Sequence, residues 1–279
     1  MKQKSGFSGQ LGFVFAAAGS AVGVGNLWRF PYLAAKDGGG LFLIIYLVLV
    51  FTVGFTLLTT DIAIGRKTGT SFLNAYKKLD KRFSFIGIIT LFIPILILPY
   101  YSVIGGWVVH FSYMFISGQG MQTANPDYFA GFISQPGWPI LFLAIFLGLT
   151  AIIVMLGVKR GIELTCKIFM PMLVLMTVGL AIYIMTLPGA MEGVKHYLIP
   201  NFSDFSFETV LAALGQLFYS MSLAMGITIT YGSYMKKDVS IEGSTKNVEI
   251  FDTAIAIMAG LMIIPAVFAF SGGDPDTLQ

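Results

Sequence analysis

Residues 16–31 read AAAGSAVGVGNLWRFP, an apolar stretch that Gly19, Ser20, Gly23 and Gly25 interrupt. Each glycine weakens a helix by roughly 0.5–1 kcal/mol relative to alanine, so the stretch is a poor continuous helix. A helix broken inside a membrane leaves backbone N–H and C=O groups unpaired, which is tolerated only where protein or a water-filled cavity covers the break. If this stretch lies in a membrane, it predicts a broken helix that lines a cavity.

The composition indicates that the chain is an integral membrane protein. Of its 279 residues, 56% are hydrophobic and 11% are charged, and the mean hydropathy is +0.81. Soluble domains carry about 25% charged residues. The net charge of +3 is too small to indicate nucleic-acid binding. Because of the apolar composition, membrane lipid is the expected surrounding of the chain. The single cysteine, Cys166, excludes an internal disulfide framework.

Apolar windows of about 20 residues predict seven membrane-spanning helices in one transmembrane domain, 1–279. Lys2 and Lys4 precede the first window as in a signal peptide, but no small-residue cleavage site follows, so we interpret it as a retained span. The seven windows cover about 11–35, 40–64, 85–112, 138–157, 166–187, 208–234 and 250–270.

The positive charges are distributed unevenly between the two ends of these spans. Of the 17 Lys and Arg residues, all but Arg29, Lys36 and Lys195 fall on one side. The positive-inside rule then places the N-terminus in the cytoplasm. We expect the chain to lie in the plasma membrane, the inner membrane of a bacterium.

A second predicted span is interrupted at SMSLAMG, residues 220–226. Carbonyl groups freed at such a break attract cations, although small residues also let membrane helices pack closely. Two interrupted spans, five spans apart, favour the ion-site interpretation, because inverted repeats of five spans have that offset. On this interpretation 11–187 is the first repeat, 208–270 holds the first two helices of the second, and the rest of the second repeat is absent.

The atoms available at the two breaks suit a hard monovalent cation. They are backbone carbonyls, an asparagine amide oxygen and hydroxyl groups, which sodium prefers as ligands, and no Cys/His cluster offers a transition-metal site. We therefore expect one or two sodium ions and no organic cofactor.

Several motifs resemble the neurotransmitter:sodium symporter family, the bacterial amino-acid transporters related to the leucine transporter. They occur in the family's order and cover essentially the whole chain: AAAGSAVGVGNLWRFPYLAAKDGGG at 16–40, LPYYS at 98–102, RGIE at 160–163, LGQLFYSMSLAMG at 214–226 and TYGSYMKKD at 230–238. The resemblance implies an all-α polytopic membrane protein with a leucine-transporter-like inverted-repeat fold, here truncated after the seventh span. It also implies sodium-coupled uptake of an amino acid by alternating access.

The resemblance also assigns roles to individual residues. For the first sodium ion it implies Ala21, Asn26 and Ser220, in a site that the substrate carboxylate completes, and for the second it implies the carbonyls of Gly19 and Val22. For the amino-acid substrate it implies Ser20, Ala21, Gly23, Gly25, Tyr101, Tyr219, Ser220, Ser222 and Met225. Arg29 resembles the outer gate and Tyr234 part of the inner gate, where Lys4 and Phe7 replace the family's Arg–Trp latch.

Three positions depart from the family pattern or need a choice of alignment. Tyr219 stands where the family usually has Phe, and Met225 stands where the leucine transporter has Phe. Because methionine adapts to irregular space, we expect a hydrophobic or aromatic substrate. Asp252 is expected to bind the first sodium and to make chloride unnecessary; the alternative is an interfacial or water-exposed aspartate near the cytoplasmic end of the last span.

Two further ionisable residues are expected to be structural. Asp61 near the inner end of the second span is expected to reach the interface or to pair locally, and His110 is expected to be a hydrogen-bonded core or interfacial residue rather than a proton relay. 

Rival functions remain open on the sequence alone. The family fold has ten core spans, so the chain could be a transport-inactive fragment or one half of a split carrier, with a separate C-terminal segment or a second copy as partner. A channel is another interpretation. A membrane-embedded hydrolase using Ser20 and His110 is disfavoured because no G-x-S-x-G motif is present, and no enzymatic activity is expected.

Overall fold

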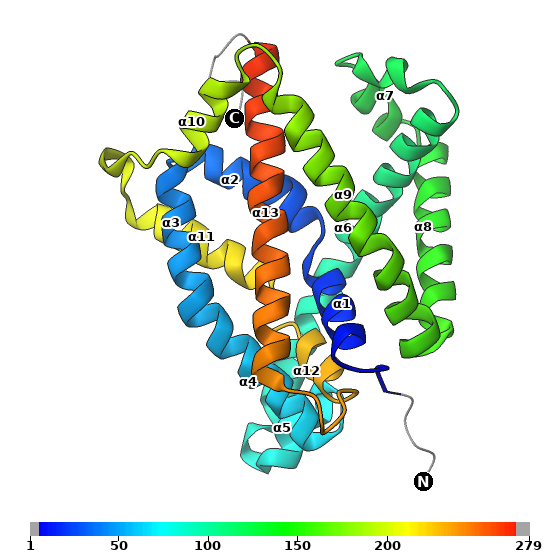
Figure 1. Cartoon of the computed structure of the whole chain (residues 1–279). Helices are drawn as coiled ribbons and strands as arrows, with labels where there is room; N and C mark the ends of the chain where they lie inside the picture. Colours follow the sequence, from blue (N-terminus) through cyan, green and yellow to red (C-terminus); the bar gives the residue numbers. More distant parts are fainter. Residues whose placement is uncertain (1–5, 272–279) are drawn as a thin grey trace.

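The computed structural model describes residues 6–271, which fold almost entirely into helices (Figure 1). Within that range five helical segments are long and apolar enough to cross a membrane, and a sixth crossing results if one bent pair counts as a single span. The bent pair is α1 (Gln10–Ala21) followed by η1 (Gly25–Arg29) and α2 (Phe30–Lys36). The five others are α3–η2–α4 (Gly40–Leu49, Val50–Gly54, Phe55–Thr68), η3–α6 (Lys81–Phe83, Ser84–Ile116), α8 (Gly137–Met155), η5–α9 (Val158–Glu163, Leu164–Met185) and α13 (Ile241–Ser271).

The predicted sixth span consists of two shorter helices. α11 (Phe207–Ser220) and α12 (Ile227–Gly232) are separated by six residues, and neither alone is long enough to span a bilayer. This second interruption lies where the sequence placed it, at 220–226.

Two predicted spans begin earlier than their hydropathy indicates. The fifth begins at Val158 rather than 166, and the last begins at Ile241 rather than 250. In both cases the first turns of the helix contain charged residues, which a search for apolar windows leaves outside the span. Glu163 is neutralised by Lys167, whose Nζ lies 2.6 Å from Glu163 Oε1.

The segments between the spans contain short helices that the sequence analysis did not predict. They are α5 (Phe72–Leu79), η4 (Gly120–Ala124), α7 (Tyr128–Ser134), α10 (Ala190–Leu198) and η6 (Phe202–Asp204). α10 packs on α13, where the Tyr197 hydroxyl donates a hydrogen bond to the Ile257 carbonyl at 3.2 Å.

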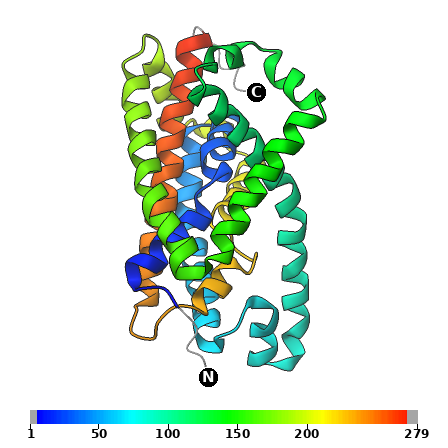
Figure 2. The same cartoon turned by 90° about the vertical axis from the view of Figure 1, so that its right-hand side faces the viewer.

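α13 runs through the middle of the molecule and organises the packing around it (Figure 1). It contacts α1, α2, α4, α9 and α10, and α9 lies beside it along much of its length (Figure 2). α6 and α8 pack on each other to one side and expose most of their apolar side chains. The core therefore lies among α1–α4 and α11–α13, the elements that contain both broken helices.

The two breaks differ in backbone geometry. The first is short: α1 ends at Ala21, and the chain bends by 55° before continuing into η1 and α2. The second holds two non-glycine residues in left-handed conformations, Ser222 with φ 53° and Ala224 with φ 60°, followed by Gly226 with φ 75°. Non-glycine residues in this region are strained by roughly 1–3 kcal/mol each, and such strain concentrates at functional sites.

Candidate functional site

A polar cluster joins the first break, the second break and α13. Asn26 Nδ2 donates to Ser220 Oγ at 3.0 Å and to Asp252 Oδ1 at 2.8 Å. Ser220 Oγ in turn donates to Asp252 Oδ2 at 2.9 Å. The exposed fractions of Asn26, Ser220 and Asp252 are 0%, 1% and 0%, so the cluster is shielded from solvent. The alternative in which Asp252 is a water-exposed aspartate is therefore wrong, because the helix begins eleven residues earlier and buries it.

A cavity of about 300 Å³ lies beside this cluster, with walls from both breaks and from α6. Seven of the nine residues expected to bind the substrate line it: Ser20, Ala21, Gly25, Tyr101, Tyr219, Ser222 and Met225. The two residues expected to supply carbonyls to a second sodium, Gly19 and Val22, line it as well. The remaining two expected substrate-binding residues do not line the cavity: Ser220 belongs to the polar cluster, and Gly23 is covered by the Tyr101 hydroxyl.

The sequence analysis missed the apolar end of this cavity. Pro94, Ile97 and Leu98 on α6 and Ile227 at the start of α12 line it. Pro94, Ile97, Leu98 and Tyr101 follow the i, i+3, i+4, i+7 spacing of one helix face, so this periodicity together with Tyr101 could have identified three of them.

Two glycines of the first break are required by close side-chain contacts. A methyl group on Gly23 would overlap the Tyr101 hydroxyl, which accepts a hydrogen bond from the Val24 backbone N–H at 3.3 Å. A methyl group on Gly25 would lie 2.9 Å from Cδ1 and Cε1 of the Tyr219 ring. These glycines therefore let two tyrosines from other helices pack directly on the unwound backbone.

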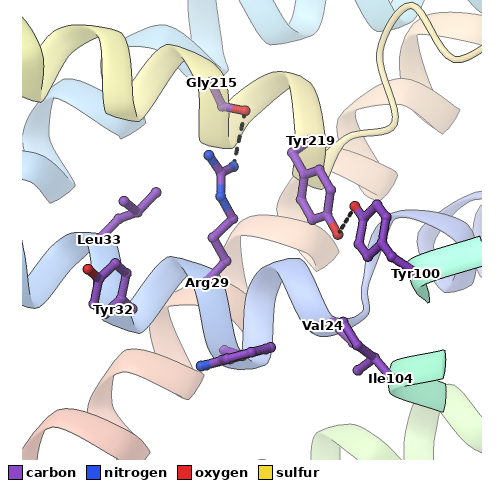
Figure 3. A pocket seen from close by; sticks show the side chains of 9 residues that line it. Val24, Arg29, Tyr32, Leu33, Tyr100, Ile104, Gly215 and Tyr219 are labelled. Carbon is purple, nitrogen blue, oxygen red and sulfur yellow. Dashed lines mark hydrogen bonds between the residues drawn. The ribbon is translucent and has the colours of Figure 1, made fainter. Parts of the chain in front are cut away.

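A second cavity of about 650 Å³ is called the outer cavity here, because Arg29, the expected outer gate, lines it; Figure 3 shows its lining residues. Tyr219 lines both cavities, so its ring is part of the wall between them. The Tyr100 hydroxyl donates to the Tyr219 hydroxyl at 3.1 Å, and the two phenols face each other in Figure 3. The remaining lining residues of the outer cavity are Val24, Trp28, Arg29, Tyr32, Leu33, Ile104 and Gly215.

Arg29, the expected outer gate, is held by α11. Its Nη1 donates to Gln216 Oε1 at 3.1 Å and to the Gly215 carbonyl at 3.5 Å (Figure 3), while its Cζ lies 5.3 Å from the centre of the Tyr219 ring. Among the described side chains, which do not include that of Asp204, no carboxylate lies within 4.0 Å of this guanidinium. Gln216 links Arg29 to the first break, because its Nε2 donates to the Gly25 carbonyl at 2.9 Å.

The opposite end of the molecule is closed by residues 6–9. Phe7 is 1% exposed, and its ring packs edge-on against Tyr231 and the predicted inner-gate residue Tyr234. Ser8 is fixed through its backbone: its N–H donates to Glu163 Oε2 at 2.9 Å, and its carbonyl accepts from Lys236 Nζ at 2.8 Å.

The Ser8 hydroxyl also contacts Glu163 Oε1. Lys4, the other inner-gate residue named from the sequence, lies outside the described residues.

Three other intramembrane polar residues have distinct surroundings. Asp61 Oδ2 accepts from the Thr228 hydroxyl of α12 at 2.7 Å, so its partner lies 167 positions away and not in its own helix. His110 is buried and hydrogen-bonded, as predicted, with Nε2 2.9 Å from the Tyr128 hydroxyl. Glu249 was not singled out by the sequence analysis; it is 2% exposed, and its Oε1 atom has no hydrogen-bond partner.

Comparison with known protein families agrees with this architecture. The sequence model of the sodium:neurotransmitter symporter family matches residues 4–125 and 128–273. The chain belongs to that family. The family is one of transporters rather than enzymes, and with the apolar helices described above it makes the chain an integral membrane protein.

Individual members of the symporter family are similar along most of the chain. The uncharacterized sodium-dependent transporter YhdH of Bacillus subtilis is 38% identical over 272 residues, which cover 95% of this chain and 60% of that protein. The sodium- and chloride-dependent taurine transporter of Rattus norvegicus is 30% identical over 283 residues, covering 84% of this chain and 45% of that protein.

A solved symporter structure confirms the fold class. The crystal structure of MhsT in complex with L-phenylalanine superposes with a TM-score of 0.89 at 39% identity, covering 98% of this chain and 64% of that chain. The chain spans about 60% of the length of the bacterial and archaeal relatives it matches.

Proposed function

We propose that the protein takes up a hydrophobic or aromatic amino acid together with sodium, by alternating access between the two sides of the membrane. The observation that carries this proposal is the junction of the two breaks. The Asn26–Ser220–Asp252 cluster lies next to a cavity of about 300 Å³, and backbone from both breaks forms part of the wall. A cation in the cluster and an amino acid in the cavity would therefore be neighbours.

The cluster supplies the kinds of ligand that sodium prefers. The Asp252 carboxylate and the Ser220 hydroxyl offer oxygens directly, and the Asn26 amide offers its oxygen after rotating by 180°. A carboxylate in this buried position would balance the charge of the ion. We accordingly propose that chloride is not needed. The Ala21 carbonyl is a further ligand in this proposal, and a second ion would take the carbonyls of Gly19 and Val22.

The cavity suits an amino acid with an uncharged side chain. Its apolar end is formed by Pro94, Ile97, Leu98, Met225 and Ile227, and its polar end by the first break and the Tyr101 hydroxyl. Its volume is at the lower end of the range for small-molecule pockets. We assign the carboxylate to Tyr101 and the side chain to the apolar end. The taurine transporter and the structure of MhsT in complex with L-phenylalanine support an amino-acid-like substrate.

The two ends of the site differ in a way that supports a gated carrier. Towards the outer side a cavity of about 650 Å³ adjoins the Tyr219 ring, whereas at the other end Phe7 and Tyr234 cover the core. We assign the outer gate to Arg29 and the inner gate to the segment containing Lys4 and Phe7 with Tyr234. The uneven Lys and Arg distribution supports a cytoplasmic location for that inner end.

The test is binding and uptake in a defined lipid system. Purified protein in lipid nanodiscs is incubated with tritiated L-phenylalanine in sodium or potassium chloride, and L-tryptophan, L-leucine and glycine are added as competitors. We expect binding in sodium only, displaced by tryptophan and leucine better than by glycine. Equal binding in both salts would overturn sodium coupling, and preferred displacement by glycine would overturn the substrate class.

Uptake into proteoliposomes under an inward sodium gradient tests transport itself. Accumulation that stops when the gradient is removed is the expected result. Sodium-dependent binding without uptake would instead support the alternative of a transport-inactive chain or one half of a carrier. For the hydrolase alternative, no hydrogen bond joins Ser20 to His110 within the described residues, and His110 Nε2 lies 2.9 Å from the Tyr128 hydroxyl instead.

A further inference from the structure

The Tyr219 ring is held from three directions by three residues of two elements, η1 and α6. The Gly25 backbone lies against one edge, so close that a methyl group there would be 2.9 Å from the ring carbons. The Arg29 guanidinium carbon lies over the ring, 5.3 Å from its centre. The third contact is the hydrogen bond of 3.1 Å from the Tyr100 hydroxyl on α6 (Figure 3).

This third contact differs from the other two because it crosses the entrance. Tyr100 lines only the outer cavity, whereas Tyr219 lines both, so their bond ties α6 to the end of α11 at the boundary between the cavities. A molecule that passes from the outer to the inner cavity must move the Tyr219 ring. That movement breaks the bond to Tyr100, whereas a phenylalanine at 219 would form no such bond.

We propose that Tyr100 is a positioning residue that latches Tyr219 across the entrance of the inner cavity and slows the exit of the bound amino acid. This inference rests on the proposed function, because it assigns the inner cavity to the substrate. The hydroxyl pair also fixes the height of the roof over the substrate side chain. Tyr100 lines the outer cavity but not the inner one, so it acts on the inner cavity through the position of the Tyr219 ring.

Dissociation rates test the latch. Tritiated L-phenylalanine bound in sodium chloride is chased with unlabelled ligand in the unmodified protein, Tyr100→Phe, Tyr219→Phe and the double variant. A hydrogen bond of this kind changes an equilibrium by about three- to tenfold, so each single variant should release the ligand faster by about that factor. The double variant should release it no faster than the single ones, because all three lack the same bond.

Tyr113→Phe is the matched control, since Tyr113 lies on α6 but lines neither of these two cavities. It should leave the rate unchanged. Unchanged rates in Tyr100→Phe and Tyr219→Phe would overturn the latch, as would additive effects in the double variant. A general loss of structure would lower the binding capacity in all variants and would not produce this non-additive pattern in the dissociation rate.

A second measurement needs no amino acid and so separates the latch from the proposed function. Met225 lines the inner cavity, and Cys166 is the single native cysteine. In a Cys166→Ala background, Met225→Cys is labelled with a charged methanethiosulfonate reagent in sodium chloride. Adding Tyr100→Phe or Tyr219→Phe should speed labelling by about three- to tenfold. Equal labelling rates would overturn the latch, whereas faster labelling in a protein that binds no amino acid would overturn only the substrate assignment.

Discussion

Asn26 and Asp252 are 226 positions apart in the chain, yet the Asn26 amide donates a hydrogen bond of 2.8 Å to the Asp252 carboxylate in a site closed to solvent. An aspartate is expensive to bury in a membrane protein unless it is paired or binds a cation. The bond holds the first break against α13, so a change in the unwound segment also changes a contact of α13. The predictions below begin with this pair.

Asp252→Asn is expected to weaken sodium binding at least about tenfold, equivalent to about 1.4 kcal/mol, because the amide removes the negative charge that the ion neutralises. We also expect chloride to restore part of the lost affinity. Sodium titrations of L-phenylalanine binding, in chloride and in gluconate, measure both effects. Asp80→Asn is the control, since Asp80 lies in an exposed turn beside Arg82. An unchanged sodium affinity without chloride dependence would remove Asp252 from the ion site.

Gly25→Ala is expected to weaken amino-acid binding by about tenfold, because its methyl group would press on the Tyr219 ring at 2.9 Å and overpacking of this kind destabilises by roughly 1–3 kcal/mol. The equilibrium dissociation constant of tritiated L-phenylalanine measures the effect. Gly148→Ala on α8 is the matched control, since a methyl group there meets no atom within 4 Å. Equal losses in both variants would show that the Tyr219 contact is not the cause.

Glu163→Ala is expected to release residues 6–9 from the inner end. The substitution removes both acceptors of Ser8 and the partner of Lys167. Each lost acceptor leaves a donor without its partner, worth about 1 kcal/mol, so amide exchange at Ser8 should accelerate by roughly tenfold. Hydrogen–deuterium exchange with mass spectrometry of the N-terminal peptide is the measurement. Asp80→Ala, which breaks the exposed pair with Arg82, should leave that peptide unchanged.

Glu249→Gln is expected to leave the fold intact and to raise its stability by about 1 kcal/mol. Glu249 is buried and its Oε1 atom has no hydrogen-bond partner. The glutamine amide has the same shape but carries no charge, so the substitution removes the free-energy cost of burying a carboxylate. Thermal unfolding in detergent measures the change. Glu242→Gln at the exposed first turn of the same helix is the contrast, because it removes a favourable charge at a helix N-terminus and should lower stability slightly. A lower melting temperature for Glu249→Gln would indicate an ionic partner for Glu249.

The sequence predicted the parts of the fold that depend on strong local signals. Glycines 19, 23 and 25 marked the first break, and left-handed Ser222 and Ala224 lie inside the stretch that marked the second. The apolar windows located the spans but not the starts of η5 and α13, because charged residues lower the hydropathy of a window even where they lie within a helix. Glu163 is such a residue, and its partner Lys167 lies one helical turn later. Phe72–Leu79 and Ala190–Leu198 are short helices with mixed composition, which a search for windows of about 20 apolar residues does not detect.

The site was predicted where it lies in the breaks and missed where it depends on tertiary contacts. Tyr101 and Met225 were found through motifs, whereas Ile97 and Leu98 join the cavity only because α6 faces it. Ser8 and Glu163, which contact each other, are 155 positions apart, and the sequence around either residue does not predict the other as its partner. The assignment of these residues to sodium and substrate remains a prediction.

The left-handed backbone at Ser222 and Ala224 means that the second break is a strained segment and not a relaxed loop. The Ser222 hydroxyl donates to the Ser20 carbonyl at 3.3 Å, so one of the two strained residues is bonded directly to the first break. Any motion that lets these two residues return to ordinary backbone angles is driven by energy that the protein already holds. The binding energy of a ligand that rearranges this contact therefore need not supply the whole free energy of that motion.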